Sequence, residues 1–143
     1  MKAWLPDKTY RYVASLVPMV CVDGIIGDGQ GHFLLVKRTQ PPFRGRWWVP
    51  GGLVRKGEKL EAAFHRKMRE ELGIVVEPPT LVGVFEIHHQ DPRMNIRGGR
   101  HVISVVFETG YYSSKPIILD GSASEFEWAH RLPKDFVVRE SYT

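Results

Sequence analysis

The most constraining feature of the chain is a pair of glycines followed by a charged, amphipathic segment, which reads GGLVRKGEKLEAAFHRKMREELGI over residues 51–74. Apolar residues recur at helical spacing between residues 59 and 72, so this part is predicted to form a helix with one buried face. Gly73 is well placed to end that helix. Gly51 and Gly52 predict a tight turn, or a close approach that a side chain would block.

Elsewhere the sequence alternates between strand signals and a few helix signals. Helices are expected from Pro6-Asp7 to Val17, ended by Pro18, and over residues 133–138. Strands are expected at residues 19–26, 33–37, 47–49, 81–88, 101–109 and 125–129, with a hairpin turn at residues 27–31. This order indicates an α/β (α+β) class with a mixed sheet flanked by helices. A length of 143 residues suits a single domain over residues 1–143.

Composition excludes several classes of protein. No run approaches 18 apolar residues, so no membrane partner is expected. The N-terminal segment lacks the apolar core of a secretion signal. Cys21 is the single cysteine, which excludes an internal disulfide and fits a reducing, cytoplasmic location.

The chain carries a net charge of +4, which favours anionic ligands. The basic residues are spread among acids, with no Lys/Arg block and no zinc-ligand spacing, so nucleic acid is not the expected partner. Phosphorylated small molecules are the favoured ligands. A solvated surface explains the charge equally well.

Two neighbouring acids, Glu70 and Glu71, lie near the end of the predicted helix. Lys67 precedes them by three and four positions, so the three side chains share one helix face. Taken alone, such a pair is more often an ordinary solvated one. Beside a glycine turn, however, carboxylates can hold Mg²⁺, which prefers oxygen ligands, against a phosphate chain.

The spacing from Gly52 to Glu58, Arg66 and the acidic pair resembles the signature of the Nudix hydrolases, which cleave nucleoside diphosphates linked to another group. The resemblance implies a Nudix-type α/β/α sandwich. It also implies Mg²⁺, with Mn²⁺ as a substitute, bound by Gly51, Glu70 and Glu71. Glu58 and Arg66 are expected to pair and brace the loop against the helix, and Arg66 is counted with the catalytic candidates.

Lys67 departs from that family pattern, in which the arginine is normally followed by a glutamate. A cation at this position would repel a second metal ion and could pair with Glu71. The expectation is therefore that this protein uses fewer metal ions than typical members, with Lys67 among the substrate-binding residues as a contact to phosphate.

A narrower resemblance, to the GDP-mannose mannosyl hydrolase branch, rests on the runs from Gly31 to Thr39 and from Val49 to Gly52. It implies that Asp23 contacts the sugar or base and that Arg38 contacts the diphosphate. Relatives in this branch are dimers, so a homodimer is an expectation by analogy. That branch cleaves a C–O bond with a histidine base, but Ala123 stands at the corresponding position here, and Ser122 replaces a metal-binding glutamine.

Other bases are therefore candidates, namely Glu125 and either His88 or His89. Strand alternation directs at most one of the two histidines into a site. Arginines at positions 44, 46, 97 and 100 could clamp phosphates, although exposure to solvent is as good an explanation. Core packing is the more common use of the adjacent tryptophans Trp47 and Trp48, ahead of stacking on a base.

The sequence predicts a Mg²⁺-dependent hydrolase of a nucleoside diphosphate derivative, with a GDP-mannose-like nucleotide sugar as the favoured small-molecule substrate. Two alternatives stay open. One is a pyrophosphatase acting on nucleoside triphosphates or ADP-ribose. The other is a nucleotide-binding domain that has lost catalysis, which Lys67 and Ala123 would favour.

Overall fold

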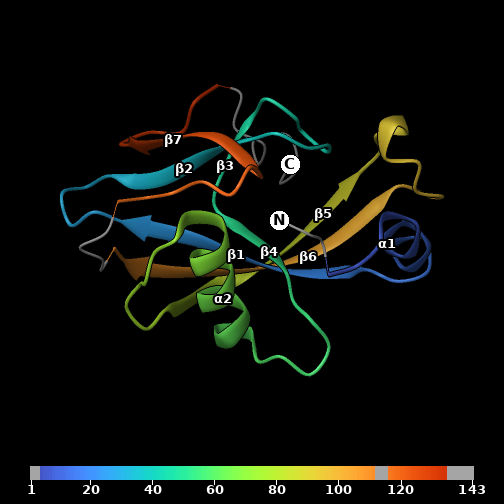
Figure 1. Cartoon of the computed structure of the whole chain (residues 1–143), viewed down its shortest axis with the longest axis horizontal. Coiled ribbons are helices and arrows are strands. Elements are labelled where there is room, and N and C mark those ends of the chain that lie inside the picture. The colour runs from blue at the N-terminus through green and yellow to red at the C-terminus, as the bar shows by residue number, and fades with distance from the viewer. Residues whose placement is uncertain (1–3, 112–115, 135–143) are drawn as a thin grey trace.

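The computed structural model describes residues 4–111 and 116–134 (Figure 1). Its elements follow one another as α1 (Asp7–Ala14), β1 (Met19–Gly27), β2 (Phe33–Arg38), β3 (Trp47–Trp48), β4 (Gly51–Leu53), α2 (Leu60–Leu72), β5 (Thr80–His89), the 3₁₀ turn η1 (Pro92–Met94), β6 (Arg100–Gly110) and β7 (Ala123–Ala129). The predicted mixed sheet with flanking helices is confirmed.

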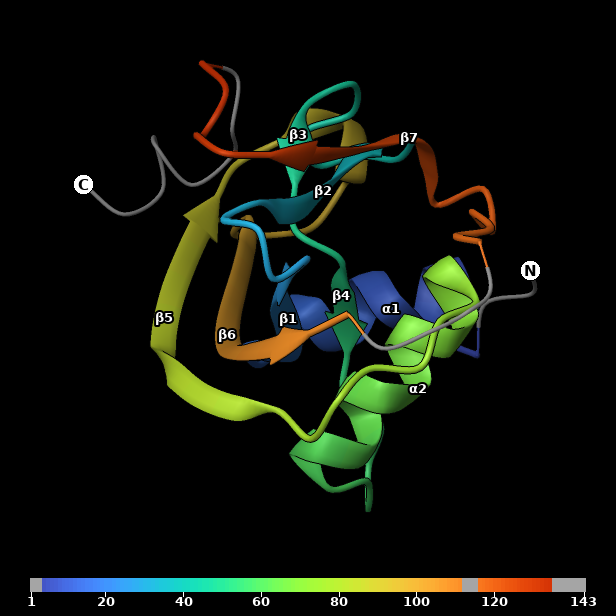
Figure 2. The same ribbon diagram turned by 90° about the vertical axis from the view of Figure 1, so that its left-hand side faces the viewer.

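The sheet divides into two parts that share one narrow junction. In the first part, β1 pairs in parallel with β6 and antiparallel with β4, and β6 pairs antiparallel with β5. In the second part, β2 pairs antiparallel with β3 and with β7. Within the described chain, β1 and β2 pair at Gly27 and Phe33 and then diverge, so the predicted hairpin is confirmed. Figure 2 shows the two parts as separate layers, with β2, β3 and β7 above β1, β4 and β6.

Helix α2 packs its apolar face against the first part of the sheet. Phe64, Met68 and Leu72 are fully buried, and the Phe64 ring lies 5.4 Å from that of Phe107 on β6. Gly73 ends the helix in the left-handed region at φ 66°, which confirms its predicted role as the cap. This packing places the charged side chains that flank the apolar face of α2, those of Arg66, Lys67 and Glu71, beside β4.

The predicted turn at Gly51-Gly52 is wrong, because both glycines lie in β4 and pair with β1. At Gly51 the need for glycine is one of space, because the backbone of β1 blocks a Cβ, whereas at Gly52 only the flexible end of the Lys67 side chain lies in the way. A Cβ on Gly51 would lie 2.2 Å from the Val22 carbonyl oxygen, and one on Gly52 would lie 2.3 Å from Cε of Lys67. The second sequence-based expectation for these glycines, a close approach that excludes a side chain, is the correct one at Gly51.

Helix α1 ends at Ala14, earlier than predicted, and the apolar residues that follow it, Leu16 and Val17, are exposed. The closing helix expected at residues 133–138 lies mostly outside the described residues. Among the helices of residues 4–111 and 116–134, none has the length and apolar character needed to cross a bilayer.

Candidate functional site

A cavity of about 590 Å³ opens between the two parts of the sheet. Side chains from β1, β2, β4, β6 and α1 line it, together with the segment that precedes β3 and the loop between β5 and β6. The main polar residues in this wall are Asp7, Tyr10, Arg11, Asp23, Arg38, Gln40, Glu71, Arg93, Asn95, Arg100 and Ser122. Because the walls come from both layers, the divergence of β1 and β2 creates the space.

One side of the cavity carries two guanidinium groups, those of Arg38 and Arg100. Arg38 Nε donates to the carbonyl oxygen of Pro42 at 2.7 Å, and Arg100 Nε donates to Oη of Tyr10 at 2.9 Å. Burial, followed by the nearby charge of Arg100, lowers the pKa of Arg38. Two partly buried cations that repel one another indicate a site for an anion with more than one negative charge.

Asp23 lies deep in the same cavity on β1, directly opposite Gly51 of β4. Its carboxylate accepts hydrogen bonds from Oγ of Ser104 and from Nε1 of Trp48, the latter at 3.3 Å. Burial raises the pKa of Asp23, while the two hydrogen bonds act in the opposite direction. The buried indole of Trp48 is thus a wall of the cavity and a donor to Asp23.

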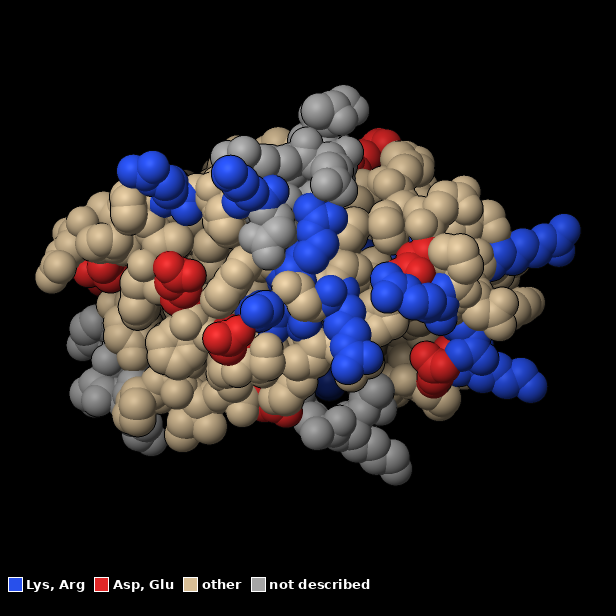
Figure 3. Space-filling model, turned by 90° about the horizontal axis from the view of Figure 1, so that it is seen from above, with Lys and Arg blue, Asp and Glu red and all other residues tan. Residues whose placement is uncertain are grey.

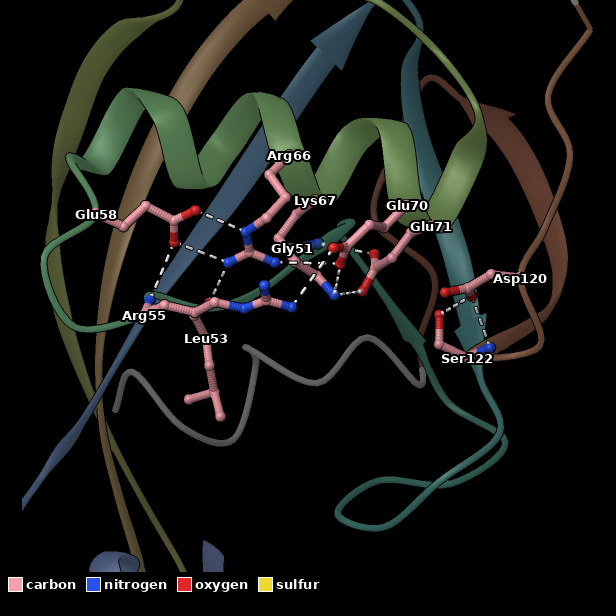
Figure 4. A network of polar contacts seen from close by, with 10 residues as sticks. All are labelled: Gly51, Leu53, Arg55, Glu58, Arg66, Lys67, Glu70, Glu71, Asp120 and Ser122. Carbon is pink, nitrogen blue, oxygen red and sulfur yellow. Dashed lines mark hydrogen bonds and ion pairs between the residues drawn. The ribbon is translucent and has the colours of Figure 1, made fainter. Parts of the chain in front are cut away.

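Arg66 of α2 is the centre of a polar network that joins the helix to the loop before it (Figure 4). Its Nε and Nη2 donate to the two carboxylate oxygens of Glu58 at 2.7 and 2.9 Å. Nη2 also donates to the carbonyl oxygen of Leu53 at 2.9 Å, and Nη1 donates to Glu70 at 3.1 Å. The predicted pairing of Glu58 with Arg66 is present, and the loop folds back to make it.

Lys67 lies between the two acids that were predicted to bind metal. Its Nζ is 3.3 Å from Oε1 of Glu71 and 3.6 Å from Oε2 of Glu70, so the predicted helix pair with Glu71 is present. The other oxygen of Glu71 accepts the backbone N–H of Gly51 at 3.2 Å. Burial raises the pKa of Glu71 to about 7, against the opposing charge of Lys67.

The donor set fits a hard divalent cation. Glu70 and Glu71 supply carboxylate oxygens next to the Gly51 backbone, which is the ligand type that Mg²⁺ and Mn²⁺ take. The cluster is already balanced in charge, because Glu58, Glu70 and Glu71 face Arg55, Arg66 and Lys67. A cation therefore competes with Lys67, and its added charge is best offset by a phosphate chain.

The structure brings together Asp23, Arg38, Gly51 and Glu71 in the main cavity, and Arg66, Lys67 and Glu70 in a second, neighbouring one of about 620 Å³. Glu125 and His88 are not among the described residues that line either cavity. Glu125 of β7 pairs with Lys37 of β2 at 3.1 Å. The His88 side chain is 67% exposed. A role for either residue as the base stays a prediction without support from its position.

Some of the remaining sequence candidates line the cavity, and others are exposed to solvent. Arg100 lines the cavity, whereas Arg44 and Arg97 are exposed. Phe43 lines the cavity with Trp48, and the ring of His89 lies 4.1 Å from the Phe43 ring. His89 is therefore the member of the histidine pair that faces the cavity side, as strand alternation requires.

Sequence reasoning missed Arg55, Arg93 and Asp120. Arg55 approaches Glu70 at 3.6 Å, and Arg93 lines the main cavity. Asp120 donates its backbone N–H to the carbonyl oxygen of Glu71 and accepts from Ser122. Its charge contributes to the raised pKa of Glu71. Asp120 stands two residues before Ser122, one of the positions that the narrower resemblance compares, so that resemblance is the signal that points to its loop.

Comparisons with known proteins agree with this geometry. A family model described as NUDIX domain matches residues 17–132. The chain is 41% identical over 97 residues to an ADP-ribose pyrophosphatase of Methanocaldococcus jannaschii, which is 68% of this chain and 53% of that relative. The chain thus spans about half the length of that relative. It is 33% identical over 132 residues to the low-salt glycan biosynthesis protein Agl8 of Haloferax volcanii, covering 92% of this chain and 79% of Agl8.

The crystal structure of a MutT NUDIX hydrolase from Burkholderia pseudomallei superposes with a TM-score of 0.72 at 30% sequence identity, covering 85% of this chain and 91% of that one. This similarity confirms the expected α/β sandwich. The family model covers the strands that form the cavity and the helix that carries the acid cluster. The chain therefore belongs to the NUDIX domain family.

Proposed function

We propose that this protein is a divalent-cation-dependent hydrolase of a nucleoside diphosphate linked to a sugar, a class that includes nucleotide sugars and ADP-ribose. The observation that carries the proposal is the cavity itself. Its wall holds both the guanidinium groups of Arg38 and Arg100 and the carboxylate of Glu71. This arrangement suits a diphosphate held between cationic side chains and a bound cation.

Each group has a part that follows from its chemistry. Arg38 and Arg100 bind the diphosphate oxygens through charge-assisted hydrogen bonds. Glu70 and Glu71 would hold the cation, with Arg66 and Glu58 fixing the loop and helix around them. A bound cation neutralises the diphosphate and polarises the bond that is cleaved. Asp23, buried beside Trp48, is the proposed acceptor for a sugar or base hydroxyl or amine.

The relatives support a nucleoside diphosphate derivative as substrate, but they do not identify the group that is linked to the diphosphate. One is named for ADP-ribose and another for glycan biosynthesis. The sequence resemblance to GDP-mannose mannosyl hydrolases favours a nucleotide sugar. However, Ala123 lines the cavity where that branch has its histidine base, and alanine accepts no proton. Cleavage of the diphosphate P–O bond is therefore as well supported as cleavage of the anomeric C–O bond.

A substrate panel with product analysis tests the proposal. GDP-mannose, ADP-ribose and a nucleoside triphosphate are compared in the presence of Mg²⁺, and the reaction in ¹⁸O-labelled water locates the broken bond. We expect turnover of a sugar-linked diphosphate in preference to the triphosphate. Preference for the triphosphate would contradict this proposal and would favour a pyrophosphatase that acts on nucleoside triphosphates.

A second candidate is a nucleotide-binding domain without catalysis, and one observation favours it. Lys67 already contacts both Glu70 and Glu71, which leaves a cation to compete for them. This candidate predicts micromolar binding of ADP-ribose or GDP-mannose by calorimetry with no product after prolonged incubation with Mg²⁺ or Mn²⁺. Turnover of any member of the panel excludes it.

Lys67 is also expected to limit the number of metal ions, because its ammonium group lies where a further cation would be repelled. We predict that the variant Lys67→Glu binds at least one Mn²⁺ more than the wild type, counted by electron paramagnetic resonance in the presence of a non-hydrolysable diphosphate. The exposed neighbour Arg69 provides the control Arg69→Glu, which adds the same charge on another face of α2. Equal stoichiometry in the wild type and Lys67→Glu would contradict this role.

A further inference from the structure

Three side chains with metal-binding atoms converge on one face of the β5–β6 ribbon, away from the acid cluster. Glu86 and His88 lie two residues apart on β5, so strand alternation places them on the same face. His101 of β6 is the direct cross-strand partner of His88. The two imidazole rings stack with their centroids 4.1 Å apart.

The distances within this trio match those of a metal coordination sphere. Oε2 of Glu86 lies 3.5 Å from Nε2 of His88 and 3.7 Å from Nε2 of His101, and one ligand atom from each residue lies within 4.8 Å of the other two. Ligands about 2.1 Å from a tetrahedral zinc ion are separated by about 3.4 Å. Two of the three distances between ligand atoms are therefore already close to the value that a tetrahedral site requires.

His101 adds an independent sign of a missing partner. Within the described part of the chain, its Nε2 is shielded from solvent and has no hydrogen-bond partner. A buried polar nitrogen without a partner costs free energy, and a metal ion would satisfy it. His88 and Glu86 are more than 60% exposed, so an ion can enter from solvent and keep water in its remaining position.

We propose that Glu86, His88 and His101 form a second metal site, for Zn²⁺ or a similar first-row transition metal ion. Two imidazoles and one carboxylate favour such ions over Mg²⁺, which prefers a shell made of oxygens. The site is separate from the acid cluster, since it uses none of the residues of α2 or β4. It does not depend on the proposed function.

The position of the site gives it a structural consequence for the main cavity. His88 and His101 lie next to the ends of β5 and β6 that the loop joins, and this loop supplies Arg93, Met94 and Asn95 to the cavity wall. A metal ion bound across the two strands would fasten the base of this loop. The residues of the opposite face, Ile87 and Val102, also line the cavity.

The test is a titration of tag-free, chelator-stripped full-length protein with Zn²⁺ in excess Mg²⁺, so that the acid cluster is occupied by the ion it prefers. We expect the wild type to bind one Zn²⁺, and Co²⁺ in its place to give the visible absorption of a low-symmetry site. His88→Gln and His101→Gln should each weaken Zn²⁺ binding by about tenfold or more, and Zn²⁺ should raise the Tm of the wild type alone.

The matched control is His89→Asn, which removes a histidine from the adjacent position on the opposite face of β5 and should leave Zn²⁺ binding unchanged. His88→Gln is the more decisive variant, because a side chain that is 67% exposed can be replaced without loss of folding. The proposal is overturned if the wild type binds no Zn²⁺ under these conditions. It is equally overturned if both glutamine variants bind Zn²⁺ as tightly as the wild type.

Discussion

Arg66 joins three parts of the chain through one guanidinium group, since it contacts Glu58 in the loop, Leu53 at the end of β4 and Glu70 on its own helix. Its side chain is only 14% exposed, and the side chains of Glu58 and Glu70 are 16% and 24% exposed. Removing it takes both guanidinium hydrogen bonds from the Glu58 carboxylate, which keeps the backbone N–H of Arg55, and takes the Arg66 donor from the Leu53 carbonyl. Breaking a pair of this kind is more costly than losing an exposed ion pair.

We predict that Arg66→Ala lowers the free energy of unfolding by about 3 kcal/mol in urea denaturation, because it leaves partly buried acceptors unpaired. The exposed neighbour on the same helix, Arg69→Ala, should change it by less than about 0.5 kcal/mol. Similar effects of the two substitutions would show that the network contributes little to stability.

Glu58 gives the same network a dependence on pH. The hydrogen bond from Arg66 is the main cause that lowers the pKa of Glu58 from 4.5 to about 2. The unfolded chain therefore binds a proton at higher pH than the folded one, and the stabilisation from Glu58 is present above pH 4.5 and lost as the pH falls towards 2. The pKa of Glu71 shifts in the opposite direction, because burial raises it to about 7. The contribution of Glu71 to stability therefore has the opposite dependence on pH.

We predict that the wild type is more stable than Glu58→Gln at pH 6 and that this difference shrinks between pH 4.5 and 2. Urea denaturation of the two proteins across this range measures the difference directly. A difference that stays constant with pH would mean that Glu58 contributes through its shape and not through its charge.

At the scale of elements, β4 is the segment that positions the site. It pairs with β1 so closely that a Cβ on Gly51 would lie 2.3 Å from Oδ1 of Asp23. The Gly51 N–H is also the donor to Glu71. One short strand thus fixes the distance between a buried carboxylate of the cavity and the acid cluster of α2.

We predict that Gly51→Ala destabilises the protein by at least about 2 kcal/mol, because β4 must move away from β1 to admit the methyl group. Gly27→Ala is the matched control, since its Cβ would have its nearest contact at an ordinary 3.7 Å. Chemical denaturation compares the two variants, and a loss in Gly27→Ala as large as that in Gly51→Ala would refute the steric argument.

The elements that sequence predicted well are those whose signals are local. The helix at residues 59–72 shows its apolar period within its own sequence, and Gly73 ends it by its own backbone freedom. The strand at Gly51 was read as a turn, because its pairing with β1 depends on residues far away in the chain. The contact of Asp120 with Glu71, the place of Arg93 in the cavity wall and the pairing of His88 with His101 depend on distant parts of the chain in the same way.

At the scale of the whole molecule, the excess of basic residues is not gathered into one uniform surface. Figure 3 shows Lys and Arg side chains across the middle of one face, with Asp and Glu among them. The net charge of +4 is therefore expected to attract anionic ligands without fixing where they bind. The expected homodimer stays a prediction.

We predict that the KM for a sugar-linked nucleoside diphosphate rises by about three- to tenfold as salt increases from about 50 to about 300 mM, while kcat changes less. Screening weakens the attraction between the cavity arginines and the diphosphate before the chemical step. Steady-state kinetics at several salt concentrations measure this effect, and a KM that does not respond to salt would place the binding energy in uncharged contacts.

The junction of the sheet at Gly27 and Phe33 has one more consequence. The two layers share little backbone pairing. A bound ligand between them could therefore enlarge the cavity by shifting side chains, while the hydrogen bonds between strands within each layer stay intact. We expect the fold itself to accommodate ligands of different size in the cavity. Selectivity would fall to the few polar groups that line the opening.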